Sequence, residues 1–168
     1  PSEMEEELGK QAFDSILSQS HVIEDPEIEA QLAILAEPLI ASIDSERYSF
    51  QFVIIEDESI NAFALPGGYM ALHTGLILKA DRPEEVLGVM AHELAHVTEQ
   101  HSLRVLIKQA GIGIIMSMAL GDFAALAGQA QGLLNLKFSR NHETEADTVG
   151  FHTLERANID PKGMIDFF

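Results

Sequence analysis

One segment near the middle of the chain carries two histidines and a glutamate within five residues. His92, Glu93 and His96 lie within residues 86–97, a stretch that is otherwise apolar. Residues four apart stack on one face of an α-helix, so both imidazoles point to the same place. Burying three such polar side chains is unfavourable unless each finds a partner. The chain must therefore fold so that this helix is covered while the two imidazoles meet a shared ligand.

The spacing of these residues is the H-E-x-x-H pattern of zinc metalloproteases. In that pattern the histidines bind the metal and the glutamate is the general base for a water molecule. Pro83 and the acidic residues after it favour a helix start just before the motif. The alternative is a pair of core histidines hydrogen-bonded to backbone carbonyls. The pattern predicts His92 and His96 as metal ligands and Glu93 as the base.

The third metal ligand must be His, Asp or Glu, because the chain contains no cysteine. A second helical pattern, from about residue 140 to 157, offers two glutamates. Glu143 shares its helix face with small and apolar residues that suit close packing, whereas the face of Glu145 is of the solvent-exposed type. We therefore predict Glu143 as the third ligand and Glu145 as a solvated charge. Asp147, one turn after Glu143, is predicted to hydrogen-bond the far nitrogen of a ligating histidine.

Extended patterns precede the first motif. Aromatic and β-branched residues run from Phe50 to Ile55, and residues 61–65 and 69–73 flank the sequence Pro66-Gly67-Gly68. Proline and glycine together favour a turn, so the two flanking runs are predicted to form a β-hairpin. A sheet edge beside a metal-binding helix is useful to a peptidase, because an extended substrate can add to it as a further strand. The equal alternative is a hairpin with a structural role only.

Three motifs, taken in order, resemble those of the HtpX-like and CAAX-prenyl-protease-like zinc metallopeptidases, which are gluzincins. They are N-A-F-A-x-P-G-G at residues 61–68, H-E-x-x-H at residues 92–96 and S-R-x-x-E-x-x-A-D at residues 139–147. The likeness is greatest to the soluble, periplasmic BepA-like branch of the family. With the patterns above, it predicts an α+β, zincin-like fold. We expect a mainly helical chain with a small, mostly antiparallel three-stranded sheet packed beside the zinc-binding helix.

The resemblance also implies a set of roles. It implies one Zn²⁺ per chain on His92, His96 and Glu143, with Glu93 as the catalytic glutamate, Asp147 as an outer hydrogen-bond partner, and Asn61, Ala62, Phe63 and Ala64 as the substrate-binding edge. The ligand types favour zinc, with cobalt or manganese as alternatives. The implied activity is that of a zinc metalloendopeptidase acting on extended or misfolded proteins in envelope quality control.

Further expectations concern location and partners. The resemblance implies a periplasmic or otherwise extracytoplasmic protein whose partners are protein or peptide substrates, with peripheral membrane or envelope-complex association. A formal charge of −17, from 27 acidic and 10 basic residues, argues against nucleic acid as a partner. The alternative from another class is a chaperone or assembly factor with a latent or structural zinc site.

The length of 168 residues predicts one metallopeptidase catalytic domain over residues 1–168, a fragment without the carboxy-terminal region that family members often carry. Its apolar runs are too short to span a bilayer. The Gly- and Ala-rich region from Leu103 to Leu136 is predicted to be a helical hairpin or lid over the cleft. A membrane-touching or partner-binding patch is the alternative for it. His101, nine residues after His92, is predicted to face away from the motif.

Overall fold

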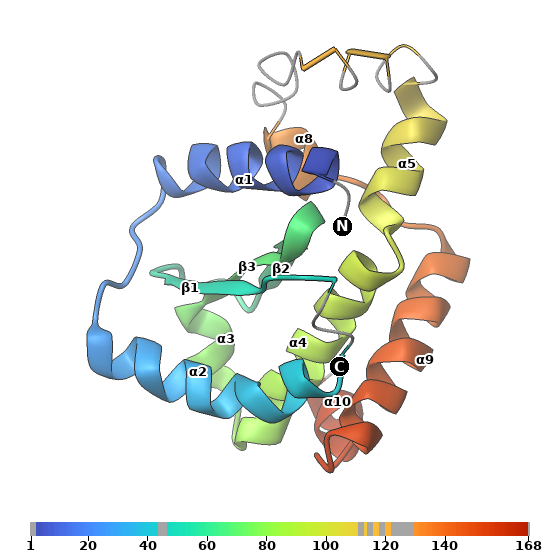
Figure 1. The fold of residues 1–168 in the computed structure, drawn as a ribbon. Coiled ribbons are helices and arrows are strands. Elements are labelled where there is room, and N and C mark those ends of the chain that lie inside the picture. The colour runs from blue at the N-terminus through green and yellow to red at the C-terminus, as the bar shows by residue number, and fades with distance from the viewer. Residues whose placement is uncertain are drawn as a thin grey trace.

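Helices surround a small sheet in the computed structural model of the chain (Figure 1), which describes residues 3–43, 47–110, 113, 116–117, 120–121 and 130–167. In chain order its elements are α1 (Glu3–Leu17), α2 (Pro26–Ala41), β1 (Gln51–Ile55), β2 (Ala62–Leu65), a 3₁₀ turn (Pro66–Gly68), β3 (Tyr69–His73), α3 (Thr74–Lys79), α4 (Pro83–Thr98), α5 (His101–Ala110), α8 (Ala130–Leu134), α9 (Arg140–Arg156) and α10 (Lys162–Phe167). The predicted motif helix, the helix that follows residue 140 and the hairpin are all present.

The three strands form a mixed sheet in the order β1-β3-β2. β2 and β3 are antiparallel and joined by the predicted turn, in which Gly67 and Gly68 have φ angles of 85° and 102°. β1 pairs with β3 in parallel, along its full length from Gln51 to Ile55. The prediction of a mostly antiparallel sheet is therefore wrong for one of the two strand pairs. The reason is that β3 inserts between β1 and β2, which a hairpin-only prediction does not anticipate.

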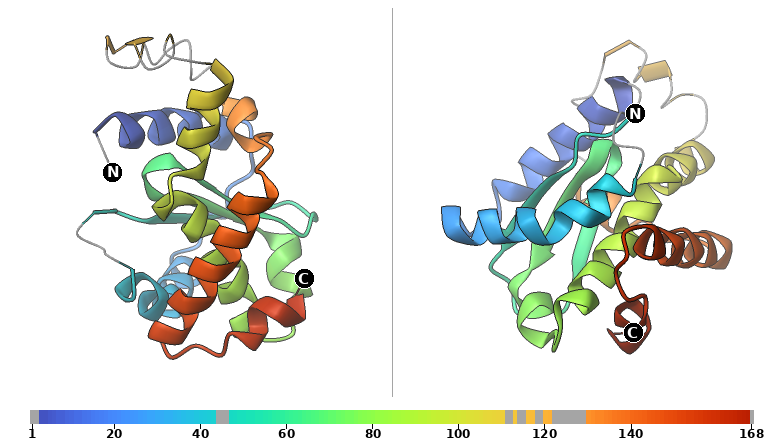
Figure 2. Two further views of the ribbon diagram at one scale, coloured as in Figure 1. Left: turned by 90° about the vertical axis from the view of Figure 1, so that its right-hand side faces the viewer. Right: turned by 60° about the horizontal axis from the view of Figure 1, so that its bottom comes forward.

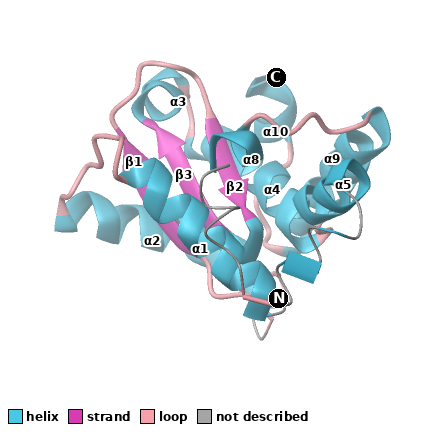
Figure 3. Ribbon diagram, turned by 90° about the horizontal axis from the view of Figure 1, so that it is seen from above, coloured by secondary structure: helices cyan, strands magenta, loops and turns pink. Residues whose placement is uncertain are grey.

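The sheet is buried on both faces, with α1 on one side and α2 on the other (Figure 3). Successive residues of the central strand β3 alternate between two apolar clusters. Met70 and Leu72 pack in the cluster that contains α2, α4 and α10, whereas Tyr69 and Ala71 pack with α1 and α8. Because the strand order is β1-β3-β2, β2 is an edge strand, and it contacts α4.

Two glycines permit the close packing of helices around α4, which is itself largely buried. A Cβ atom on Gly150 of α9 would lie 3.1 Å from the backbone nitrogen of His92, so a larger residue would push α9 away from the motif. On α10, a Cβ atom on Gly163 would lie 2.2 Å from the carbonyl oxygen of Glu84. Both α9 and α10 pack against α4, and the left view of Figure 2 shows α9 beside it. The acidic face of α9 is thereby brought up to the histidines.

The structure describes only part of the region from Leu103 to Leu136, for which a helical hairpin or lid is predicted. α5 and α8 are helical, and α8 packs against α1 and β2. Most of the span from residue 111 to 129 lies outside the described residues, so the predicted hairpin or lid stays a prediction there. Within the part of the chain that the structure describes, every helix is too short or too polar to cross a bilayer.

Candidate metal centre

The two motif histidines face one another on α4, and a carboxylate from α9 completes a three-membered cluster. The Nε2 atoms of His92 and His96 lie 3.1 Å apart. An Oε2 atom of Glu143 lies 3.5 Å from the first of these nitrogens and 4.0 Å from the second. Both imidazoles are buried, whereas the Glu143 carboxylate is about half exposed. Among the described residues, these three side chains form the group able to hold a metal ion.

The spacing of the cluster fits a tetrahedral metal. Zinc bonds of about 2.0–2.2 Å to imidazole and carboxylate place neighbouring ligand atoms about 3.3–3.6 Å apart. The observed separations of 3.1, 3.5 and 4.0 Å lie around that range. Two neutral imidazoles that present lone pairs to each other repel unless a proton or cation lies between them. The donor set of two nitrogens and one oxygen therefore suits a divalent cation.

Asp147 lies one turn after Glu143 on α9 and contacts the other side of His92. Its Oδ1 atom is 2.9 Å from Nδ1 of His92 and accepts that N–H. A neutral imidazole that donates from Nδ1 carries its lone pair on Nε2, the nitrogen that faces His96. Asp147 therefore selects the tautomer in which His92 presents a bare nitrogen to the cluster.

His101 is placed differently from its prediction. It begins α5, is fully buried, and its Nδ1 lies 2.9 Å from Nδ1 of His96. The prediction that it faces away from the motif is wrong, because the helix does not continue unbroken from His92 to His101. α4 ends at Thr98, and Gln100 adopts a left-handed conformation with φ of 56°. This turn redirects the chain and returns the imidazole of His101 to the motif.

Glu145 is likewise more than a solvated charge. It lies outside the three-residue cluster, as predicted, but its Oε2 atom accepts a hydrogen bond of 3.0 Å from Nε2 of His101. Arg104 donates to the same oxygen at 3.3 Å. The hydrogen bond from His101 is the main reason why the pKa of the Glu145 carboxyl is lowered. The pattern of helix faces distinguishes Glu143 from Glu145 but does not indicate a partner for Glu145.

Glu93 lies on the side of α4 that faces the sheet edge. Burial raises the pKa of its carboxyl from 4.5 to about 8; the negative charge of Glu143 adds to this, and a hydrogen bond from the Ala64 backbone N–H opposes it. Burial also lowers the pKa of His96 to about 3, with the neighbouring histidines contributing. The site therefore disfavours charge on the His96 imidazole, while the Glu93 carboxyl has an unusually high proton affinity.

The raised pKa of Glu93 predicts how Glu93→Gln affects the stability of the metal-free chain. A carboxyl whose pKa rises on folding binds its proton more tightly in the folded state, so stability falls as pH increases from about 4.5 to 8. Glutamine does not titrate and avoids this loss. With a chelator at pH 9, the rise of this pKa from 4.5 to about 8 should make the variant more stable by about 5 kcal/mol. Thermal denaturation should show a melting temperature higher by roughly 10–20 °C. At pH 4 the gain should vanish, and an equal gain at both values would contradict the burial of Glu93.

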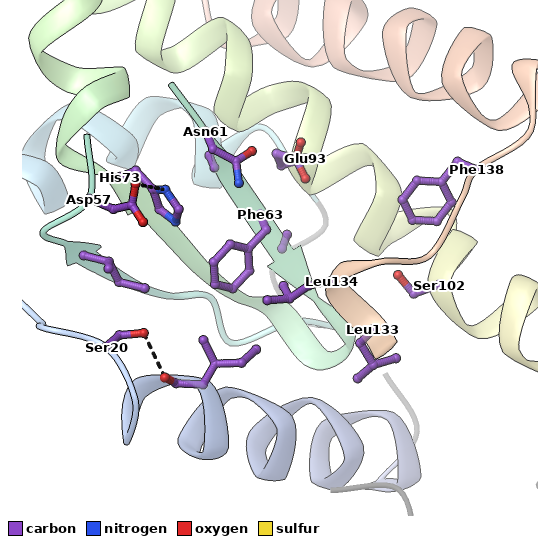
Figure 4. A pocket seen from close by; sticks show the side chains of 14 residues that line it. Ser20, Asp57, Asn61, Phe63, His73, Glu93, Ser102, Leu133, Leu134 and Phe138 are labelled. Atoms are coloured by element: carbon purple, nitrogen blue, oxygen red, sulfur yellow. Dashed lines mark hydrogen bonds and ion pairs between the residues drawn. The ribbon is translucent and has the colours of Figure 1, made fainter. Parts of the chain in front are cut away.

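A cleft of about 360 Å³ runs between β2, α4 and the segment that leads into α9. Figure 4 shows Asn61 and Phe63 of this edge on one wall, with Glu93 nearby and Phe138 beyond it. Ala62 and Ala64 also line the cleft, so all four residues of the predicted substrate edge border the same cavity as Glu93. A second cavity, of about 520 Å³, lies on the other side of the cluster against Phe151 and α10. The three-residue cluster and Glu93 thus lie between two open spaces.

Fold and site together define a metallopeptidase: a helix with H-E-x-x-H, a glutamate from a second helix, and an edge strand beside them. The chain matches the sequence profile of Peptidase family M48 over residues 24–168, and it belongs to that family, whose members are metal-dependent peptidases. This confirms both the family resemblance and the metallopeptidase class predicted from the motifs.

Named relatives agree with this assignment. A provisionally named beta-barrel assembly-enhancing protease of Vibrio cholerae is 37% identical over 88% of this chain and 33% of its own length. The beta-barrel assembly-enhancing protease of Escherichia coli K12 is 30% identical over 97% of this chain and 36% of its own length. Metalloprotease YcaL of the same strain is 29% identical over 82% of this chain and 56% of its own length. The chain therefore spans about a third of the length of the assembly-enhancing proteases that it matches.

Proposed function

We propose that this chain is a zinc-dependent endopeptidase in which His92, His96 and Glu143 hold one Zn²⁺ and Glu93 is the general base. The observation that carries the proposal is the convergence of the two Nε2 atoms and the Glu143 carboxylate, all within 4.8 Å of one another, a spacing that one ion could bridge. Two imidazoles and one carboxylate form a set that zinc prefers, and three protein ligands leave a position for water, as in catalytic zinc sites. Cobalt and manganese are the other metals compatible with these ligands.

Glu93 is suited to move a proton between water and the leaving amine. When bound, zinc supplies Lewis acidity that lowers the pKa of water and polarises a carbonyl group. The Glu93 carboxylate takes the proton released by the water, and its buried position gives it the proton affinity to do so. The same carboxyl then protonates the amine of the cleaved bond. Asp147 keeps His92 in the tautomer that presents Nε2.

The open edge of β2 is the proposed binding site for the substrate backbone. The carbonyl oxygen of Asn61 accepts from His73 of the neighbouring β3 region, whereas the N–H of Ala64 points the other way, to Glu93. Backbone groups alternate in direction along a strand, so those of Ala62 and Ala64 point to the cleft. An extended peptide can add there as a further strand, held by backbone hydrogen bonds that do not depend on its side chains.

The substrates that best fit such an edge are extended or misfolded proteins, because folded domains pair or cover most of their strands. We propose that the chain acts in envelope protein quality control, in the periplasm or another extracytoplasmic compartment. The support is its similarity to proteases named for beta-barrel assembly. The excess of acidic residues also favours unfolded clients with basic segments. Association with envelope complexes or a membrane surface belongs to the same proposal.

The test is hydrolysis of casein with and without a chelator such as 1,10-phenanthroline. We expect cleavage by the zinc-loaded chain, its loss on chelation and its return with one equivalent of zinc. Suppression of aggregation, measured alongside, covers the alternative of an assembly factor with a structural zinc site. A fourth protein ligand would favour that alternative, and the cluster among the described residues has three members. Chelator-resistant aggregation suppression without any cleavage would overturn the proposal.

A further inference from the structure

A continuous line of hydrogen bonds leads from the metal cluster to the surface of α9. Nδ1 of His96 lies 2.9 Å from Nδ1 of His101, and Nε2 of His101 lies 3.0 Å from Oε2 of Glu145. The line ends at Arg104, which donates to the same oxygen at 3.3 Å. Its members come from α4, α5 and α9. Figure 1 shows α9 beside α4, with α5 beginning where α4 ends. None of the roles proposed above uses His101 or Glu145.

The Glu145 carboxylate at the outer end of this line determines which ring nitrogens of His101 and His96 carry protons. Glu145 is a carboxylate that accepts, so Nε2 of His101 must be the protonated nitrogen of that ring. A neutral His101 then has a lone pair on Nδ1 and accepts from Nδ1–H of His96. His96 is left with its lone pair on Nε2, the atom that faces His92 and Glu143. Each proton has one consistent position, and the consequence is a bare nitrogen directed to the cluster.

Aromatic rings stacked on His96 and His101 fix the orientation of both imidazoles. Phe138 stacks on the ring of His96 at 4.2 Å between centroids, with 23° between planes. His142 stacks on the ring of His101 at 4.5 Å and 20°. His101 has no exposed surface, and His96 is 4% exposed. Rotation of either ring would therefore break a hydrogen bond and a stacking contact together.

We propose that His101 is a positioning residue that couples Glu145 to the metal ligand His96. The proposal rests on the proposed function, since it gives His96 the part of a ligand. The arrangement has a counterpart across the cluster, where Asp147 contacts the other motif histidine directly. Two carboxylates of α9 would thus orient the two motif histidines. Asp147 contacts His92 directly, whereas Glu145 contacts His96 through His101. Such outer partners fix the tautomer and raise the basicity of a metal-bound imidazole.

The rival explanation is that His101 only fills space beneath α5. Zinc binding would then depend on the shape of the side chain at position 101 and not on its hydrogen bonds. The two explanations therefore predict different zinc affinities for substitutions of similar size. His101→Leu fills the space without any polar atom. His101→Asn keeps an acceptor at the position of Nδ1 but does not reach Glu145. Glu145→Gln changes only the outer end of the line, on a side chain that is 42% exposed.

The first experiment is a zinc titration of the chain against a chromogenic chelator. His101→Leu should weaken zinc binding by about 10- to 100-fold, the usual cost of losing an outer partner. His101→Asn should bind more tightly than His101→Leu, and Glu145→Gln should weaken binding in the wild-type background but not in His101→Leu. His152→Leu is the matched control, because that histidine pairs with Glu155 on the exposed side of α9 and should bind zinc like the wild type.

A second experiment reads the protons directly and does not depend on any variant folding. Long-range ¹H–¹⁵N spectra of the zinc-loaded chain should show His101 protonated at Nε2 and His96 at Nδ1. His101 protonated at Nδ1, or a His101→Leu variant that melts like the wild type and binds zinc equally well, would overturn the proposal while leaving the proposed function intact. Failure of the wild-type chain to bind zinc would instead overturn the proposed function.

Discussion

Replacing Glu93 with Gln is expected to leave zinc bound and to reduce casein hydrolysis by about a thousandfold. The amide has nearly the shape of the carboxylate and still fits the wall of the cleft, but it cannot take a proton from water. Glu93 is outside the three-residue cluster, so the loss of hydrolysis should come without a loss of metal. Initial rates on casein and zinc content, measured on the same preparations, check both halves of this expectation.

The matched control for this variant is Glu84→Gln, the same substitution in the first turn of the same helix. It should change neither hydrolysis nor zinc content, since Glu84 lies at the other end of α4 from the cluster. Unchanged turnover in Glu93→Gln would show that another group is the base. A parallel loss of zinc and activity would instead make Glu93 a ligand and reassign the roles around it.

Replacing Glu143 with Ala should have the largest effect on the metal itself. The substitution removes the one oxygen of the cluster and leaves two imidazoles, too few to hold zinc firmly. We expect zinc affinity to fall by more than about a hundredfold, beyond the cost of losing an outer hydrogen-bond partner. Hydrolysis should fall with it and recover in part when zinc is supplied in excess. Equilibrium dialysis with metal analysis measures the affinity.

Two other glutamates of α9 provide control variants against which the loss of zinc affinity in Glu143→Ala can be compared. Glu155→Ala removes an exposed carboxylate from the same helix and should leave zinc affinity unchanged. Glu145→Ala should produce a smaller loss than Glu143→Ala, because Glu145 reaches the cluster only through His101. If the Glu145 variant lost more zinc than the Glu143 variant, the two glutamates would have to exchange roles.

Local sequence signals were sufficient for the elements that carry the site. Pro83 and the acidic residues after it predicted the start of α4, and Pro66-Gly67-Gly68 predicted the turn between β2 and β3. The comparison of helix faces separated Glu143 from Glu145, and the structure brings Glu143 to the histidines. These successes share a cause: each depends on the period of one helix or the conformation of one turn.

The parts that sequence reasoning missed depend on how elements meet. The parallel pairing of β1 with β3 places β3 between β1 and β2, and no local pattern encodes which hairpin strand β1 joins. The spacing from His92 predicts the wrong direction for His101, because α4 ends at Thr98 and Gln100 turns the chain, and neither glycine nor proline signals this break. The helix face of Glu145 predicts a solvated charge, because the partner of this carboxylate comes from another helix.

The central claim is that one divalent cation binds where α4 and α9 meet, and anomalous diffraction from zinc-loaded crystals tests it most directly. The account predicts a single strong peak at the zinc edge, within bonding distance of Nε2 of His92, Nε2 of His96 and the carboxylate of Glu143. It also predicts a remaining position open to water. A peak elsewhere, no peak at full zinc loading, or a fourth protein ligand that closes the site would contradict the account.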